Sequence, residues 1–445
     1  MSILLSSKKA YFFIKIFLLF NAYNLFSQNL VVSKILLKGN NKTKSFVILN
    51  ELPISVGDTI QIKDLKTIKN EIKNNVFNTS LFNYVTVNDS IINNNKIIFI
   101  INVVERWYIW PYPILEHADI NFSSFLFNQN WSKINYGLMT VLYNLRGRRD
   151  FLKIKFRKGY KEQYGITYYN PYLNKKNTFL YSFEINKNIR HEYPIGIKNL
   201  KFDYYKNDTL KVFDNNFGKF TIIYRKNLYT FISFSSYFSQ TTYLINSQTK
   251  QQTLIFKPSI SYNIDKRDIH YYSLKGYYIN IKSSYAKVFS DSSNDFVSFT
   301  LDFRKYLPIN KKVNFSFRTF LNPFVDNFRN DYNSYVKNHI RATDFLVYPT
   351  NFSIQTSLKY NIMPQKDFVL KFIPFEKINR PFLSIYSGLF SDVAIIPKKF
   401  LQERILYSAG FFIDFVTYYD KVLRIEIGAN SLSNIGLYIN FLSAF

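Results

Sequence analysis

The residue types that most often carry catalysis are sparse and scattered in this chain. Its 445 residues include no cysteine, which excludes disulfides and thiolate metal sites. The four histidines fall near the ends of strand-like stretches or in loops and share no ligand spacing: His117, His191, His270 and His339. Ser-x-x-Lys, Gly-x-Ser-x-Gly and phosphate-loop motifs are absent. We therefore predict no enzymatic activity, no metal and no cofactor, although sequence alone does not exclude a Ser/His pair on neighbouring strands.

The C-terminal stretch offers another kind of chemistry, the pairing of backbone strands. Leu437, Ile439 and Phe441 alternate with polar or mixed positions, which is the period of a β-strand with one apolar face. In a transmembrane barrel, such a face meets lipid and aromatic side chains lie at the interfaces. We expect Phe441, rather than the terminal Phe445, to be that interfacial aromatic. The terminal pattern consists of Gly436, Ile439, Phe441 and Phe445.

The composition favours membrane-spanning strands over membrane-spanning helices. Phe 46 and Tyr 36 are abundant while Trp is only 3, and 47% of residues are hydrophobic. The mean hydropathy is nevertheless slightly negative, as expected for many half-apolar strands. After residue 28, no apolar run approaches the roughly 18 residues that a transmembrane helix needs.

The net charge of +28 has two interpretations. One is a basic surface for nucleic acid or anionic lipid. The other is the codon bias of an AT-rich genome, because Lys, Asn, Ile, Phe and Tyr are all enriched together. We favour the second and expect no nucleic-acid partner, since no motif of the known nucleic-acid-binding kinds is present.

Residues 1–28 have the pattern of a secretory signal peptide. Lys8 and Lys9 precede the apolar stretch Ala10–Phe20, which only Lys15 interrupts. Small or polar residues follow, and we expect cleavage after Ser27. A buried N-terminal helix is the alternative.

Residues 29–106 predict a small α+β domain of order β-α-α-β-β. Strands are expected at Leu30–Lys38, Phe82–Val87 and Lys96–Glu105. Helices are expected at Ser45–Leu52, with Thr43 as N-cap and Pro53 as terminator, and at Ile62–Val76.

Residues 107–445 predict sixteen strands of about the 9–11 residues that a tilted strand needs to cross a bilayer. If the N-terminal domain is periplasmic, connections after even-numbered strands are periplasmic and should be short. Most follow this rule, but 265–275 and 362–381 are long exceptions, and we assign 197–206 to a loop. The expected strands are 107–117, 134–143, 150–158, 161–170, 178–187, 218–226, 229–238, 254–264, 276–286, 296–306, 312–321, 352–361, 382–391, 405–416, 421–430 and 435–445.

The N-terminal domain resembles a POTRA (polypeptide-transport-associated) domain. The resemblance rests on Ile35-x-Leu37-x-Gly39-Asn40-x-x-Thr43, Gly57-Asp58 and Phe82-x-x-Val85, with the last strand ending at Glu105. It implies that the domain binds extended polypeptides by adding a strand to its exposed edge. We place that edge at Phe82, Val85 and Val87.

The strand-rich region resembles the superfamily of outer-membrane assembly and secretion barrels that includes BamA, TamA and the two-partner secretion transporters. Asn144-x-x-Gly147-Arg148 and Tyr169-Asn-Pro171-Tyr172 match an early family pattern. A second match falls on the turn between the eighth and ninth predicted strands: Asp265, Arg267, Asp268 and Gly276.

The most informative match lies between the eleventh and twelfth predicted strands. Ile340, Arg341, Ala342 and Thr343 correspond to the family's Val/Ile-Arg-Gly-Phe/Tyr signature, with Ala and Thr at its last two positions. The resemblance implies that Arg341 enters the barrel lumen and pairs with a carboxylate of the inner wall. The family's usual aspartate is replaced by Tyr386. Arg341 is then expected to pair with another carboxylate, Asp392 being nearby but toward the rim, or to stack on Tyr386.

The resemblance implies a factor that inserts β-barrel proteins into the bacterial outer membrane, with its POTRA domain in the periplasm. The seam between 107–117 and 435–445, which we expect to pair, would open and template client strands. The expected partners are unfolded outer-membrane proteins or a secreted polypeptide, the lipid bilayer and accessory assembly proteins. A two-partner-type secretion transporter is the first alternative. It ranks second because such transporters typically carry more than one POTRA unit and a plug helix, whereas we predict one unit and no plug helix here. A passive pore is the second.

Overall fold

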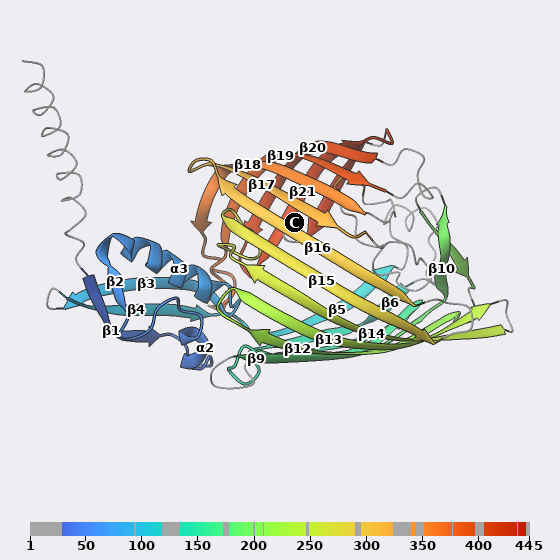
Figure 1. Cartoon of the computed structure of the whole chain (residues 1–445), viewed down its shortest axis with the longest axis horizontal. Coiled ribbons are helices and arrows are strands. Elements are labelled where there is room, and N and C mark those ends of the chain that lie inside the picture. The colour runs from blue at the N-terminus through green and yellow to red at the C-terminus, as the bar shows by residue number, and fades with distance from the viewer. Residues whose placement is uncertain are drawn as a thin grey trace, which may run out of the picture.

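The computed structural model describes residues 29–92, 95–117, 134–171, 178–198, 201–207, 209–245, 249–289, 295–323, 340–343, 351–375, 377–396, 405–433 and 435–441. The predicted signal peptide (1–28) and Phe445 lie outside this part of the chain. Figure 1 shows a small α+β domain beside a large antiparallel barrel. Within the described residues, no helix is long and apolar enough to cross a membrane.

The POTRA-like domain has a four-stranded sheet in the order β2-β1-β4-β3, with β1 and β4 parallel. Its core lies between this sheet and the helices, and includes Ile72, Val76, Phe82 and Phe99. The predicted order is confirmed with one addition, the short strand β2. The elements are β1 (Asn29–Lys38), α2 (Ser45–Leu49), β2 (Thr59–Gln61), the 3₁₀ helix η1 (Ile62–Asp64), α3 (Leu65–Phe77), β3 (Phe82–Ile92) and β4 (Lys96–Glu105).

Two helix boundaries differ from the prediction. Helix α2 ends at Leu49, because the following turn tightens before Pro53 and the Glu51 N–H bonds to the Ile48 carbonyl oxygen at 3.0 Å. Thr43 is not the N-cap: Lys44 holds that position, and no side chain caps the helix. The second predicted helix begins as η1 and becomes α-helical only at Leu65.

The sixteen predicted barrel strands are confirmed as one antiparallel sheet in sequential order from β5 to β22. Several strands are longer than predicted; β13 and β14 run through most of the polar segment 239–253, where cross-strand pairs such as Thr241 with Thr253 continue the ladder. The strands are β5 (Ile109–His117), β6 (Ile134–Tyr143), β7 (Phe151–Gly159), β8 (Lys161–Asn170), β9 (Phe179–Arg190), β12 (Phe213–Arg225), β13 (Thr230–Ile245), β14 (Thr249–Asp265), β15 (Gly276–Phe289), β16 (Phe296–Pro308), β17 (Val313–Leu321), β18 (Phe352–Asp367), β19 (Phe382–Ile395), β20 (Ile405–Thr417), β21 (Lys421–Asn430) and β22 (Ile435–Phe441).

Residues 197–206, a loop by prediction, belong mostly to a separate hairpin. Strands β10 (Glu192–Lys198) and β11 (Lys201–Lys206) pair with each other and not with the barrel sheet. The hairpin lies at the end of the barrel far from the POTRA-like domain (Figure 1).

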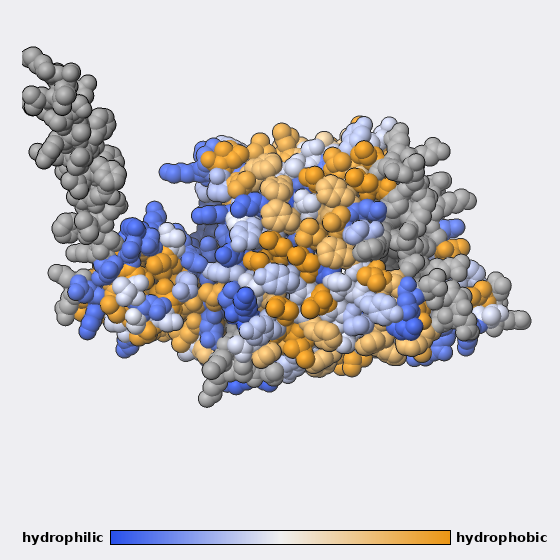
Figure 2. Space-filling view, in the orientation of Figure 1, coloured by the Kyte–Doolittle hydropathy of each residue, from blue (hydrophilic) through white to orange (hydrophobic). Residues whose placement is uncertain are grey.

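Alternation along the strands separates the lumen from the outer surface. In β19, Phe390 is buried while its neighbour Leu389 is 59% exposed. Apolar side chains accordingly spread over the outside of the barrel strands in Figure 2. This is the surface that a lipid bilayer would cover.

Candidate polypeptide-binding seam and its lumen contacts

Arg341 is held inside the barrel by a buried carboxylate. Its Nε lies 2.9 Å from Oδ2 of Asp392, its backbone N–H bonds to the same oxygen at 2.8 Å, and a second guanidinium nitrogen bonds to Oδ1. The side chain of Asp392 is completely buried. The guanidinium also donates to Ser357 Oγ at 2.7 Å and lies over the Phe390 ring, 4.4 Å from its centroid. A bidentate pair with further hydrogen bonds is the arrangement that a buried charge requires.

Tyr386 is therefore not the partner of Arg341, and the predicted stacking alternative is wrong. Tyr386 packs on Tyr272 instead, with ring centroids 4.8 Å apart. The Tyr272 hydroxyl donates to Asp414 Oδ2 at 2.9 Å, and Asp414 forms a bidentate pair with Arg424 at 2.7 and 2.8 Å. A second buried ion pair thus lies on the barrel wall, and Tyr272 of the β14–β15 turn donates a hydrogen bond to it.

The rest of the lumen segment joins the last strands of the sheet. Ala342 has a φ of +56°, a left-handed conformation that favours the glycine of the family signature. Its carbonyl oxygen accepts bonds from Asn430 Nδ2 at 2.8 Å and from the Tyr438 hydroxyl at 3.1 Å. Ile340 packs with Ala394, Ile396 and Leu406, and Thr343 donates to the Ile340 carbonyl oxygen at 2.8 Å.

Gly436 makes room for this contact to the terminal strand. A Cβ at this position would lie 2.7 Å from the Tyr438 hydroxyl oxygen, so a side chain would displace the ring that reaches Ala342. Ile439 and Phe441 point outward and are 57% and 76% exposed. The terminal pattern therefore has a lumen-facing and an outward-facing half.

The two end strands of the sheet do not pair, which corrects our expectation for the seam. Within the described residues, no ladder joins β5 to β22, and β22 pairs only with β21. The start of β5 nevertheless contacts the β20–β21 turn. The Trp107 N–H donates to the Tyr419 hydroxyl at 3.1 Å, and Tyr419 packs edge-on against Trp110.

The turn that carries Asp265, Arg267, Asp268 and Gly276 connects the lumen to the POTRA-like domain. Arg267 forms a bidentate pair with Asp265 at 2.8 and 2.6 Å, and Asp268 Oδ1 accepts the Ile269 and Leu274 N–H groups. Burial raises the pKa of Asp268 above its usual range. Gly276 has a φ of +105°, at which the turn rejoins β15. Tyr272 from the same turn enters the lumen, as described above.

The two long connections that broke the short-turn rule are contact surfaces for the POTRA-like domain. Asn78, just after α3, donates to the Asp268 carbonyl oxygen at 2.9 Å and accepts the His270 N–H at 3.0 Å. Asn83 and Tyr84, at the start of β3, donate to the carbonyl oxygens of Lys377 and Arg380 at 2.8 and 2.9 Å. Both long connections therefore hold the domain against the barrel.

Two separate sets of ion pairs also fix the same domain against the barrel. Glu51 receives two bonds from Arg225 at 3.0 and 2.7 Å and one from Arg149 at 3.2 Å. Arg106 forms a bidentate pair with Asp420, both bonds at 2.8 Å. None of these five residues is predicted from the sequence, because nothing near them in the chain shows that their partners lie across the domain boundary.

The Asn144-x-x-Gly147 motif also contacts the POTRA-like domain. Asn144 donates to the Thr43 hydroxyl at 2.9 Å, and the Lys44 N–H donates to the Gly147 carbonyl oxygen at 2.9 Å. Gly147 has a φ of +73°, and a Cβ there would lie 2.3 Å from the Lys42 carbonyl oxygen. Thr43, predicted as a helix cap, thus belongs to the junction.

A further contact involves Tyr229, in the β12–β13 turn, whose hydroxyl bonds to Glu71 of helix α3. Burial and this hydrogen bond raise the pKa of Tyr229 to about 12.

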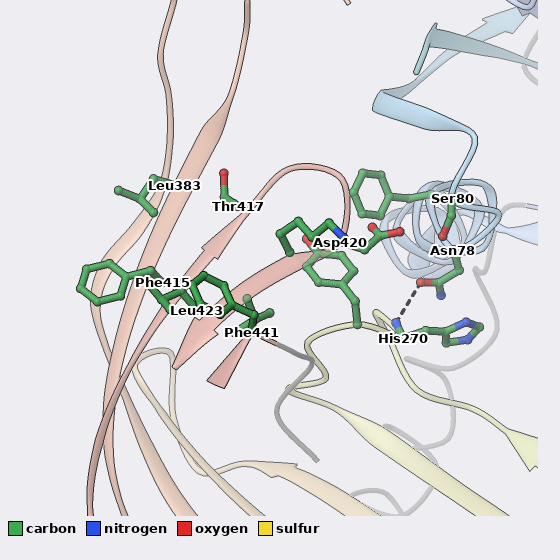
Figure 3. Close-up of a pocket in the computed structure, with 13 residues that line it drawn as sticks. Asn78, Ser80, His270, Leu383, Phe415, Thr417, Asp420, Leu423 and Phe441 are labelled. Carbon is green, nitrogen blue, oxygen red and sulfur yellow. Dashed lines mark hydrogen bonds between the residues drawn. The ribbon is translucent and has the colours of Figure 1, made fainter. Parts of the chain in front are cut away.

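An apolar cavity of about 870 Å³ lies between the POTRA-like domain and the last barrel strands (Figure 3). Phe77, Asn78 and Ser80 line it on the POTRA side, and Leu423 and Phe441 line it on the barrel side. Strand β3, which begins just beyond Ser80, is an edge strand of the POTRA sheet. Phe82 and Val85 are buried in the domain core and Val87 packs against it, so the free part of this edge is backbone.

A docked α+β domain, a sixteen-stranded barrel, a lumen arginine segment and an unpaired seam define an outer-membrane assembly and transport barrel. The Omp85 superfamily domain matches residues 144–359, and the family described as "Surface antigen variable number repeat", a POTRA family, matches residues 30–106. With an Omp85 superfamily domain and a POTRA domain, the chain is a BamA/TamA-like protein, and Omp85 family proteins are transporters and assembly factors.

Solved structures share the architecture. CdiB from Escherichia coli matches with 8% identity and a TM-score of 0.52, over 92% of this chain and 75% of that one. BamA from Haemophilus ducreyi lacking POTRA domains 1–3 matches with 14% identity and a TM-score of 0.49, over 93% and 84%. A comparison with curated protein sequences finds no match.

Proposed function

We propose that this protein inserts β-barrel polypeptides into the bacterial outer membrane. The observation that carries the proposal is the unpaired seam between β5 and β22, together with a cavity that is lined by Phe441 of β22 and by the α3–β3 turn, just before the edge strand of the POTRA-like sheet. Unpaired strand edges bind extended polypeptide through backbone hydrogen bonds.

In this proposal the POTRA-like domain lies in the periplasm and captures an unfolded client along β3. The cavity then leads from the α3–β3 turn to Phe441 on the terminal strand. Its largely apolar lining suits a segment that will later face lipid. No nucleotide is required, because strand pairing and the burial of apolar surface in lipid supply the driving force. We also propose accessory assembly proteins as partners.

The buried ion pairs at the junction support a fixed path between the two sites. Glu51 with Arg225, and Arg106 with Asp420, join the POTRA-like domain to turns on different sides of the barrel. A bidentate geometry limits rotation as well as separation.

The lumen contents argue against a passive pore. The Arg341 segment and Tyr272 both occupy the inside of the barrel. A secretion transporter is the remaining rival, and it would move its client through the lumen and not through the seam.

Conditional depletion in cells tests the proposed function. Depletion should lower the levels of other outer-membrane barrel proteins and leave inner-membrane proteins unchanged. Unchanged barrel levels, together with the loss of one secreted polypeptide, would instead identify a secretion transporter. Steady conductance that survives removal of residues 29–106 would identify a pore.

A further inference from the structure

Strand β5 carries two prolines, Pro111 and Pro113, in the middle of its nine residues. Only one edge of β5 is paired, through β6. Proline has no N–H group. It therefore weakens pairing only on the edge of the strand toward which its nitrogen points, which for β5 is either the β6 side or the seam side.

The register with β6 shows which edge this is. Tyr108 lies opposite Tyr143, one step before the Ile109–Leu142 pair, and the Tyr143 N–H bonds to the Tyr108 carbonyl oxygen at 2.7 Å. In an antiparallel ladder such hydrogen-bonded pairs recur at every second residue. The even-numbered residues of β5 therefore bond to β6, and Pro111 and Pro113 point their nitrogens at the seam.

Another proline of this chain, Pro258, shows how a proline that faces a neighbouring strand affects the ladder. Pro258, inside β14, points its nitrogen at β15, because Asp265 in the same strand bonds the other way, to Tyr229. The β14–β15 ladder pairs Phe256 with Lys287, skips Lys257 and Pro258, and resumes at Ser259. One proline facing a neighbour thus interrupts pairing over two residues. Two of them at the seam leave β5 with N–H donors only toward its ends.

The opposite edge of the seam is complete. The Ser431 N–H bonds to the Tyr407 carbonyl oxygen, so odd-numbered residues of β21 face β20 and even-numbered ones face β22. By the pairing of β21 with β22, the odd-numbered residues of β22 face the seam. All of them retain an N–H donor and a C=O acceptor, and all are highly exposed: Ile435, Leu437, Ile439 and Phe441.

We propose that Pro111 and Pro113 make β5 a non-pairing edge. As a result, β5 and β22 do not form a hydrogen-bonded ladder, and an incoming client strand adds to β22. Edge prolines are a known way to prevent strand addition. The two seam edges thereby have different roles: β22 pairs with the client strand, and β5 does not pair with it. The client part of this inference rests on the proposed function; the edge part does not.

The first experiment measures seam closure without any client. Because the chain contains no cysteine, single cysteines at Ile109 or Leu115 can be paired with one at Ile435, Ile439 or Phe441 and oxidised in liposomes. Replacing Pro111 and Pro113 by Val should raise the best disulfide yield by about twofold to tenfold for each hydrogen bond restored. Pro258→Val is the matched control and should leave the yield unchanged. Single-proline variants and heat-dependent gel mobility identify any variant that fails to fold.

The second experiment locates the client. A urea-unfolded eight-stranded outer-membrane barrel with one cysteine in its last strand is added to proteoliposomes that carry a cysteine at Ile439 or at Leu115. The yield at Ile439 should exceed that at Leu115 several-fold, and the Val variants should reduce the difference. Equal yields, or unchanged closure in the Val variants, would overturn the inference. A wild-type protein that inserts no client contradicts the proposed function, while the closure experiment still decides the role of the prolines.

Discussion

The hydroxyl of Tyr438 lies 3.1 Å from the carbonyl oxygen of Ala342, which is 96 residues earlier in the chain. This contact joins the lumen segment to β22, one of the two unpaired edges of the seam. Asn430, on the neighbouring strand, donates to the same oxygen at 2.8 Å. The position of the terminal strand therefore depends on a segment that does not belong to the barrel sheet.

Tyr438→Phe removes this hydrogen bond and keeps the ring. We expect a loss of stability of about 0.5–1.5 kcal/mol, since an ordinary buried hydrogen bond is lost. The heat-dependent gel mobility of the barrel measures it. Tyr407→Phe, on an exposed side chain, is the control and should behave as wild type.

Asp392→Asn leaves the Arg341 guanidinium buried without its counter-charge. Removing one partner of a buried pair costs about 3–5 kcal/mol, so the urea midpoint should fall strongly. Glu116→Gln breaks the more exposed pair with Arg157 and should cost less than about 1 kcal/mol. Equal effects of the two substitutions would show that the lumen pair is not stabilising.

Glu51→Gln should weaken the attachment of the POTRA-like domain to the barrel, because Arg149 and Arg225 both lose the carboxylate with which they form ion pairs. Spin labels on cysteines at Lys63 and Lys311 should report a broader distance distribution. Asp89→Asn, which breaks a pair within the domain to Lys69, should leave the distribution narrow.

Gly147→Ala should also weaken the junction. Its φ of +73° costs a residue with a side chain about 1–2 kcal/mol, and the new Cβ would clash with Lys42. Protease cleavage near residue 106 should accelerate. Gly218→Ala, where nothing lies within 4 Å of the added Cβ, should have no such effect.

Phe441→Lys should impair the protein's own assembly into the membrane more than Phe445→Lys, because Phe441 is on the outward face of β22. The cost is about 0–1 kcal/mol near an interface and rises to about 2–4 kcal/mol at the bilayer midplane. The fraction of folded barrel in outer-membrane extracts measures the effect, and equal fractions for the two variants would show that the predicted interfacial aromatic is wrong.

Much of the architecture could be predicted from the sequence, because it follows from local periodicity. Alternation along each strand, turn residues between strands and the odd-even rule for connection lengths were sufficient for sixteen strands in sequential order. The same strand count placed the connection 322–351 between the eleventh and twelfth strands, and the resemblance to the family signature then singled out Arg341 within it.

The partners of these residues were decided by tertiary structure alone. Asp392 and not Tyr386 faces Arg341, Glu51 meets Arg225 across 174 residues, and the long 368–381 connection contacts β3. Periodicity shows on which face a side chain lies, but not which residue of another element lies opposite. The unpaired seam is a case of both: Pro111 and Pro113 are visible in the sequence, but only the register with β6 shows that their nitrogens point at the open edge.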